Sequence, residues 1–192
     1  MNEKTTPLKR LNISFNLKSF ITTLSFLGFI ITQNTNTLEA KEPLLAILQK
    51  IYSNSMQKVG IGNSSYICKA YGIVSLDEIY FSAKADSLCT KSIDDFYKSH
   101  PKNQYFTNSI LRVGQKYHIE FIAKNCILYA KGETTLSEYL LKGGLASVVK
   151  KFKNPEYSDA FKKDENRAKE ERKGLWNKDI SLNCLAQKQK FN

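Results

Sequence analysis

The stretch TTLSEYLLKGGLASVVKKF, Thr134–Phe152, contains in order a helix start, a helix, a glycine stop and a strand-like run. Thr135 can cap the first helical turn, and Glu138 follows three residues later, which is the spacing of a capping box. Apolar side chains then recur at helical spacing, at Leu136, Tyr139 and Leu140. Gly143-Gly144 ends the helix before the apolar run LASVV. The stretch therefore predicts one helix followed by one strand.

Upstream of this stretch the chain is rich in aromatic and β-branched residues, which favour strands. Residues 44–61 predict two short strands around the turn Ser53-Asn54-Ser55, and residues 64–74 predict a third. Residues 115–133 predict two more, because Tyr117, Ile119 and Phe121 alternate with polar side chains.

Two further helices are expected on either side of the opening stretch. Residues 89–100 predict a helix that Pro101 stops. Residues 154–176 predict a long last helix, with Pro155 at its first position and Gly174 at its end. Five short strands with about three helices indicate the α+β class and a small β-barrel that carries helices.

The first forty residues have the pattern of an export signal. Four basic residues precede an apolar run of twelve, residues 20–31, and a polar stretch leads to Ala40. The run is too short to span a bilayer, so we expect cleavage after Ala40, with a retained N-terminal anchor as the alternative. In either case we expect the rest of the chain to be exported, either periplasmic or secreted, with no stable transmembrane span once the signal is removed.

The mature chain, residues 41–192, is long enough for one domain with a real core. Removing the four basic and two acidic residues of the signal leaves 25 Lys and Arg against 16 Asp and Glu, a net charge of +9. Such a charge suits nucleic acid, anionic lipid or acidic cell-wall polymers, but solubility alone also explains it. An even cysteine count after an export signal favours two disulfides over a metal site, and no CxxC pair is present; the cysteines are Cys68, Cys89, Cys126 and Cys184.

Two C-terminal segments carry a family resemblance. LSEYLLKGGLASVVKKF and AFKKDENRAKEERKGLWNKDI together resemble the C-terminal half of the staphylococcal nuclease (thermonuclease) family. The N-terminal half follows the family pattern more weakly, from Lys41 through KAYGIVSLDE. The resemblance implies a domain over residues 41–180, a tail over 181–192 and an oligonucleotide-binding (OB) type of five-stranded barrel. In active members it implies a calcium-dependent phosphodiesterase that acts on DNA and RNA.

The family's catalytic parts are mostly missing. Its first metal-binding turn, DGDT, is replaced by Ser53-Asn54-Ser55-Met56, which offers only neutral ligands. In the next motif the family's Arg has become Lys69, and its metal-binding Asp falls at Val74 or Ser75. Glu78 is the candidate for the catalytic Glu, with Asp77 as the alternative. These losses predict a domain with no metal site and no cofactor, in which Lys69 and Glu78 are catalytic remnants.

The connection IAKN, residues 122–125, is also shorter than the family's loop, which carries its second Arg. Lys124 is the nearest cation, and we assign it no catalytic role. Four cysteines allow three pairings. The resemblance favours Cys68–Cys126, because the two strands that hold these residues run close together in the family fold, and this leaves Cys89–Cys184.

Three functions stay open on the sequence alone. The first is an exported, catalytically degenerate thermonuclease-like domain that acts as a binding or assembly module for single-stranded nucleic acid or an envelope protein. Its nucleic-acid contacts would be aromatic side chains such as Tyr66, which could equally fill the core, and the basic tract Lys150, Lys151 and Lys153. The second is a divergent active metal-dependent nuclease that uses Glu78, Asp77 and Lys69, the only case in which calcium is expected. The third is a barrel that serves a different ligand.

Overall fold

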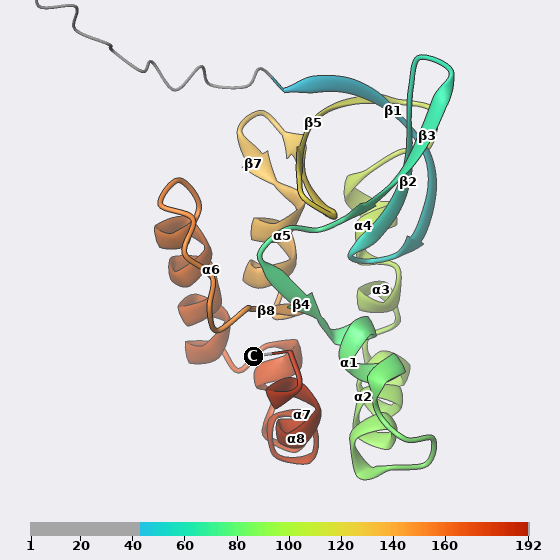
Figure 1. Cartoon of the computed structure of the whole chain (residues 1–192). Helices are drawn as coiled ribbons and strands as arrows, with labels where there is room; N and C mark the ends of the chain where they lie inside the picture. Colours follow the sequence, from blue (N-terminus) through green and yellow to red (C-terminus); the bar gives the residue numbers. More distant parts are fainter. Residues whose placement is uncertain (1–42, 192) are drawn as a thin grey trace, which may run out of the picture. The chain divides into compact units, whose positions relative to one another are not determined.

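The computed structural model describes residues 43–191, so the predicted export signal, residues 1–40, lies outside the described residues. A six-stranded antiparallel sheet has the order β3-β2-β1-β5-β6-β7, and β4 and β8 form a small second sheet (Figure 1). The strands are β1 Leu44–Ser53, β2 Met56–Ile61, β3 Ser64–Lys69, β4 Ile73–Ser75, β5 Lys116–Ile122, β6 Asn125–Lys131, β7 Thr134–Thr135 and β8 Ala146–Val148.

The large sheet closes into a barrel where β3 meets β6, a line of contact that we call the seam. Ala70 forms a parallel bridge with Cys126, and the Tyr71 amide donates to the Cys126 carbonyl over 3.0 Å. Cys68 and Cys126 form a disulfide across the same line, with Cα atoms 5.3 Å apart. The predicted α+β class with a small OB-type barrel is confirmed, although the described residues hold more and shorter elements than the five strands and three helices expected.

The predicted strand over residues 64–74 is in fact two strands, β3 and β4, that belong to different sheets. Gly72 lies between them with φ +74°, a left-handed conformation that breaks an extended run. A side chain there would also meet the ring of Phe152, whose Cζ lies 2.8 Å from an ideal Cβ position. The chain therefore turns at Gly72 and pairs with β8 instead of continuing along β2.

Eight α-helices and one 3₁₀-helix occur within residues 43–191. They are α1 Leu76–Ser82, α2 Leu88–Ser99, α3 Pro101–Gln104, α4 Phe106–Ile110, α5 Leu136–Lys142, α6 Ser158–Glu170, η1 Gly174–Trp176, α7 Lys178–Asn183 and α8 Leu185–Gln189. The opening prediction is confirmed: Thr135 caps α5, Glu138 completes the capping box, and Gly143 is the C-cap. Pro101 ends α2 as predicted and also provides the first residue of α3.

The last helix is shorter than predicted at both ends. Asn154 accepts from the Glu156 amide through its side chain and from the Ser158 amide through its carbonyl, both over 2.9 Å, so Pro155 lies in a turn before the helix. At the other end Arg172 adopts φ +51°, and the Lys173 amide donates to the Ala168 carbonyl, which closes the helix as in a Schellman motif. Gly174 therefore begins η1 and does not end α6.

The core lies inside the barrel and between the barrel and the helices. Its largest fully buried side chains come from both parts: Phe161, Leu48, Leu76, Ile79, Ile93, Leu111, Ile119, Ile127, Leu136, Leu140, Leu141 and Leu145. Figure 1 shows α6 beside α5, on the far side of α5 from β1, β2 and β3.

Short helices occupy the segment that we expected to be a tail. α7 and α8 follow η1, and Cys184 between them forms a disulfide with Cys89 of α2, with Cα atoms 4.7 Å apart. The structure thus pairs the four cysteines in the way that the family resemblance favoured. In residues 43–191, no helix is both long enough and apolar enough to cross a bilayer.

Candidate functional site

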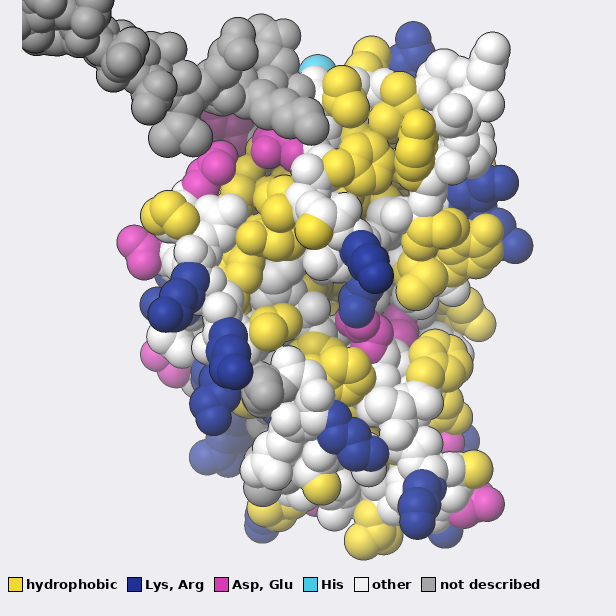
Figure 2. All heavy atoms as spheres, in the orientation of Figure 1, with side chains coloured by type: hydrophobic (Ala, Val, Ile, Leu, Met, Phe, Trp, Pro, Cys, Tyr) yellow, Lys and Arg dark blue, Asp and Glu magenta, His cyan; other side chains and the backbone are white. Residues whose placement is uncertain are grey.

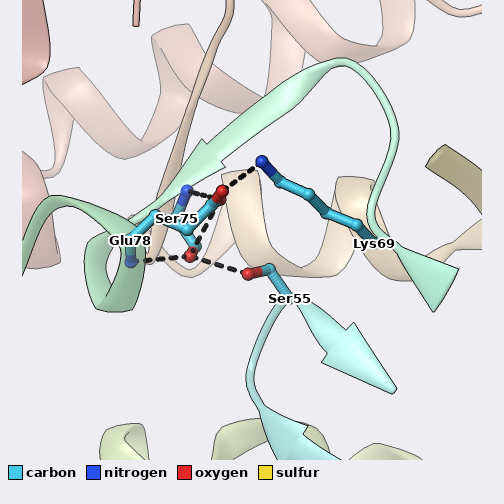
Figure 3. A network of polar contacts seen from close by, with 4 residues as sticks. All are labelled: Ser55, Lys69, Ser75 and Glu78. Atoms are coloured by element: carbon cyan, nitrogen blue, oxygen red, sulfur yellow. Dashed lines mark hydrogen bonds and ion pairs between the residues drawn. The ribbon is translucent and has the colours of Figure 1, made fainter. Parts of the chain in front are cut away.

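The structure brings the two catalytic candidates, Lys69 and Glu78, into direct contact. Lys69 is the last residue of β3, and Glu78 lies in the first turn of α1. Their side chains form an ion pair between Nζ and Oε1 (Figure 3). The Glu78 side chain is 15% exposed and that of Lys69 is 38% exposed, so the pair lies at the surface with the carboxylate on its protected side.

Glu78 also caps the helix to which it belongs. Ser75 is the N-cap of α1, and its hydroxyl accepts from the Glu78 amide over 3.2 Å. In return, Glu78 Oε2 accepts from the Ser75 amide over 2.9 Å and from the Ser75 hydroxyl over 3.2 Å. One carboxylate oxygen is thus committed to the cap and the other to Lys69. Glu78 therefore has a structural role in the α1 cap and in the ion pair with Lys69.

A second serine completes this network. Ser55 lies in the turn between β1 and β2, and its hydroxyl is 2.8 Å from the Ser75 hydroxyl (Figure 3). Both serines are fully buried. We call Ser55, Lys69, Ser75 and Glu78 the closed network, because each member bonds to at least one other.

Calcium does not fit the closed network. This ion prefers several carboxylate and carbonyl oxygens, whereas the network offers two hydroxyls and one carboxylate that is already paired with an ammonium group. A cation placed there would meet the positive charge of Lys69. Within the described part of the chain, no group of three His, Cys, Asp or Glu side chains could hold a metal ion.

Asp77, the alternative catalytic acid, joins three elements. Its carboxylate accepts from the Asn54 amide over 2.9 Å and from the Tyr97 hydroxyl over 2.6 Å. Burial raises the pKa of Tyr97 well above its usual range, and the neighbouring Asp77 charge raises it further. The Asn54 side chain in turn accepts from the Thr107 amide of α4 over 3.0 Å. Asp77 therefore ties the β1–β2 turn to α1 and α2.

The strands that meet at the seam carry two aromatic side chains in contact with each other and two lysines next to these positions in the sequence. Tyr66 and Phe121 have ring centroids 5.3 Å apart, and Tyr66 is 44% exposed. Phe121 is the register partner of Cys126. On β3, Tyr66 lies two residues before Cys68, and Lys69 directly follows Cys68. The short β5–β6 turn carries the exposed Lys124 next to Ala123, which has φ +52°. We call Tyr66, Lys69, Phe121 and Lys124 the seam surface.

The basic tract Lys150, Lys151 and Lys153 lies in the loop between β8 and α6, and all three side chains are exposed. Phe152 holds this loop in place, because its ring contacts that of Tyr71 at 5.2 Å and stacks on that of Phe161 at 5.3 Å. Tyr71 comes two residues after Lys69, so the tract lies beside the chain that leaves the seam surface.

A large cavity with acidic side chains in its lining lies elsewhere. It has a volume of about 930 Å³ and is lined by Pro43, His118, Tyr129, Gly132, Glu133, Thr134, Glu138, Glu156, Tyr157 and Ala160. At one wall the Tyr129 hydroxyl donates to Glu120 and lies 2.8 Å from the Tyr157 hydroxyl. Burial, and then the hydrogen bond to Glu120, raises the pKa of Tyr129 to about 12. Figure 2 shows acidic side chains grouped in the upper left of the view, over this region. The carboxylates that line this cavity would repel the phosphates of a nucleic acid.

A family model matches the C-terminal half of the chain, where the sequence resemblance was strongest. Residues 112–178 match the family model described as staphylococcal nuclease homologue. This segment is therefore similar to part of a staphylococcal nuclease domain. The match runs from the residues before β5 into the first residue of α7 and covers about a third of the chain, so the closed network lies outside it. A comparison with curated proteins gave no match.

Sequence reasoning missed α1 and with it the structural part that Glu78 plays. The signal was present, since Ser75 and Glu78 have the same capping-box spacing as Thr135 and Glu138. The acidic cavity was also missed, because Tyr157 reaches Tyr129 and Glu120 only when the start of α6 packs against the β5–β6 hairpin.

Proposed function

We propose that this protein is an exported single-stranded nucleic-acid-binding protein whose staphylococcal nuclease-like domain does not hydrolyse its ligand. The closed network carries this proposal, because Lys69 and Glu78 neutralise each other, and the resemblance would place metal ligands in the turn that holds the buried Ser55 and at Val74 or the buried Ser75. Loss of metal, general base and phosphate-binding arginines removes the main sources of transition-state stabilisation, while binding needs none of them.

The seam surface and the basic tract beside it support binding. Tyr66, which is 44% exposed and packs on the partly buried Phe121, offers a ring on which a base can stack, and Lys124 with Lys151 and Lys153 offers positive charge for phosphates. Bases of a single strand are free to stack on aromatic rings, whereas those of a duplex stack on one another. This arrangement therefore favours single strands over duplex, with little regard to sequence.

The export part of the proposal rests on residues 1–40 and on the two disulfides. Disulfides persist in oxidising compartments outside the cytoplasm, and all four cysteines are paired in the structure. The protein would thus meet nucleic acid in the periplasm or outside the cell, as a binding or assembly module. An envelope protein as the partner, and a divergent nuclease that uses Glu78, Asp77 and Lys69, are the competing outcomes.

A binding titration tests the proposal. Oxidised protein is titrated against fluorescent oligo-dT and oligo-U at several salt concentrations, and affinity is expected to fall as salt rises. Changing Tyr66→Ala with Phe121→Ala should weaken binding by about tenfold or more, because stacking contributes roughly 1–3 kcal/mol for each base. Phe81→Ala is the matched control, since Phe81 is 78% exposed in another aromatic pair, with Tyr80.

Two results would count against binding at the seam surface. Absence of any salt-sensitive binding would move the proposal to a protein partner. An equal loss in the Phe81→Ala control would show that the effect comes from general damage and not from the Tyr66–Phe121 pair.

A further inference from the structure

The register of the large sheet places apolar and basic side chains together on its solvent side. Lys58 of β2 pairs with Lys50 of β1 on one side and with Ile67 of β3 on the other. One row further, Ile47 pairs with Lys116 of β5. The alternate positions, such as Leu48 and Val59, are fully buried, so this side of the sheet faces away from the core. We call Leu45, Ile47, Lys50, Lys58, Ile67 and Lys116 the outer sheet face.

Three aliphatic side chains on this face are unusually exposed. Leu45 is 51% exposed, Ile47 is 44% exposed and Ile67 is 50% exposed. Single exposed aliphatic residues are common on protein surfaces. Three on one sheet face form a patch that favours contact with an apolar surface of a protein or a membrane.

The charged residues named on this face are all lysines, and the face borders the acidic cavity at His118, the register partner of Leu45. β1, β2 and β3 contain no Asp or Glu, and Glu120 of β5 is hydrogen-bonded to Tyr129 at the acidic cavity. Among the described residues, Lys50, Lys58 and Lys116 take part in no ion pair. In Figure 2 the upper right of the view, over β2 and β3, shows hydrophobic and lysine side chains with no acidic side chain among them.

Two uncharged polar side chains on this face, Gln49 and Ser65, are hydrogen-bonded to each other. Gln49 lies across Gly60, where a side chain would displace it, and its Oε1 accepts from the Ser65 hydroxyl over 2.8 Å. The strand amides are engaged in the ladders β1–β2, β2–β3 and β1–β5. Covering this face therefore leaves few unpaired polar groups, which lowers the cost of removing water from it.

We propose that the outer sheet face docks on the surface of an anionic phospholipid bilayer. Lysines around the aliphatic side chains would contact the headgroups while Leu45, Ile47 and Ile67 enter the boundary with the acyl chains. A nucleic-acid strand fits this face less well, because bases stack on aromatic rings and the three exposed apolar residues named on this face are aliphatic; the exposed Tyr52 beside it has Lys50 Nζ 4.9 Å from its ring centroid. The aromatic pair Tyr66–Phe121 belongs to the seam surface. Lipid docking is independent of the proposed function.

Vesicle sedimentation tests this proposal. The chain from Lys41 to Asn192 is used, because it forms a compact unit that contains the whole described core and both disulfides and lacks the apolar run at residues 20–31. We expect it to bind vesicles that mix phosphatidylglycerol with phosphatidylcholine and not vesicles of phosphatidylcholine alone. Salt should weaken the binding, because surface lysines and anionic lipids attract each other through screened charges.

Two double variants locate the contact. Lys50→Glu with Lys58→Glu should lower the partition coefficient by about thirtyfold or more. Ile47→Ser with Ile67→Ser should lower it by roughly tenfold. The matched control, Lys162→Glu with Lys163→Glu, makes the same charge change at exposed positions of α6 and should leave the partition within about twofold of the unchanged chain. Thermal unfolding of each variant shows whether it is folded.

Three results would overturn the proposal. The first is equal binding to both kinds of vesicle, and the second is an equal loss in the α6 control. The third combines two observations: the unchanged chain binds no vesicles, and the Lys50→Glu with Lys58→Glu variant loses oligonucleotide binding. This result would assign the face to nucleic acid. Because oligonucleotide binding is measured on the same variants, failure of lipid docking and failure of the proposed function are distinguishable.

Discussion

Gly144→Ala should destabilise the domain more than a Gly→Ala change at an open turn such as Gly62. Gly144 ends the α5 segment with φ +69°, and its carbonyl accepts from the Leu175 amide over 2.8 Å. An ideal Cβ at Gly144 would lie 2.6 Å from the carbonyl carbon of Lys173, which is backbone and cannot rotate away. The segments Gly144-Leu145 and Gly174-Leu175, which both belong to the stretches that carry the family resemblance, therefore contact each other through their backbones.

The expected cost has two parts. The left-handed conformation costs an alanine roughly 1–2 kcal/mol. Displacing the Lys173 backbone adds about 2 kcal/mol, by comparison with other changes that force a packed backbone to move. Gly62→Ala isolates the first part, because Gly62 has φ +55° with no atom within 4 Å of the added Cβ. In urea unfolding of the oxidised protein, Gly144→Ala should lose about 3–4 kcal/mol and Gly62→Ala about 1 kcal/mol.

Thermal unfolding gives a second measurement of the same difference. For a domain of this size, 1 kcal/mol shifts the midpoint by about 2–4 °C, so we expect a fall of roughly 10 °C for Gly144→Ala and about 3 °C for Gly62→Ala. Equal falls for the two variants would refute the idea that the backbone contact, and not the φ angle alone, requires a glycine at position 144.

Three further predictions concern the polar and covalent contacts. Ser75→Ala should cost about 1–2 kcal/mol of unfolding free energy, because it removes the α1 cap and the partner of a buried hydroxyl; Ser82→Ala, at the other end of α1, is the control. Replacing Cys89 and Cys184 together by Ala should cost about 2–5 kcal/mol, measured against the oxidised parent. The Tyr129 pKa of about 12 predicts stability that is full below about pH 10 and is lost as the pH rises through 12; a Tyr129→Phe variant that kept the whole of that loss would contradict it.

Local sequence signals predicted the parts of the fold that local interactions hold. The capping box at Thr135 and the glycine stop at Gly143 depend on residues a few positions apart, and both are observed. α1 has the same local signal, but Glu78 was interpreted as a catalytic remnant, and Ser75 as one of two positions, with Val74, where the family's metal-binding Asp is lost. The boundaries of α6 were wrong because Asn154 and Arg172 decide them through turn geometry that proline and glycine positions alone do not reveal.

The site depended on contacts between distant segments. The Lys69–Glu78 ion pair and the Ser55–Ser75 hydrogen bond join β3, α1 and the β1–β2 turn, so no spacing rule predicts them. The outer sheet face was hidden for a related reason. The apolar run at Leu44–Leu48 has side chains on both sides of β1, and only the register with β2 and β5 shows which of them face solvent.

The most direct test of the central claim is a cleavage assay on the same oxidised protein that is used for binding. The chain from Lys41 to Asn192 is incubated with single-stranded DNA and RNA, with calcium, with magnesium and with a chelator, and the products are separated by size. Because calcium does not fit the closed network, we predict intact substrate under all three conditions, together with salt-sensitive binding. Calcium-dependent cleavage that disappears in Glu78→Gln would contradict the account.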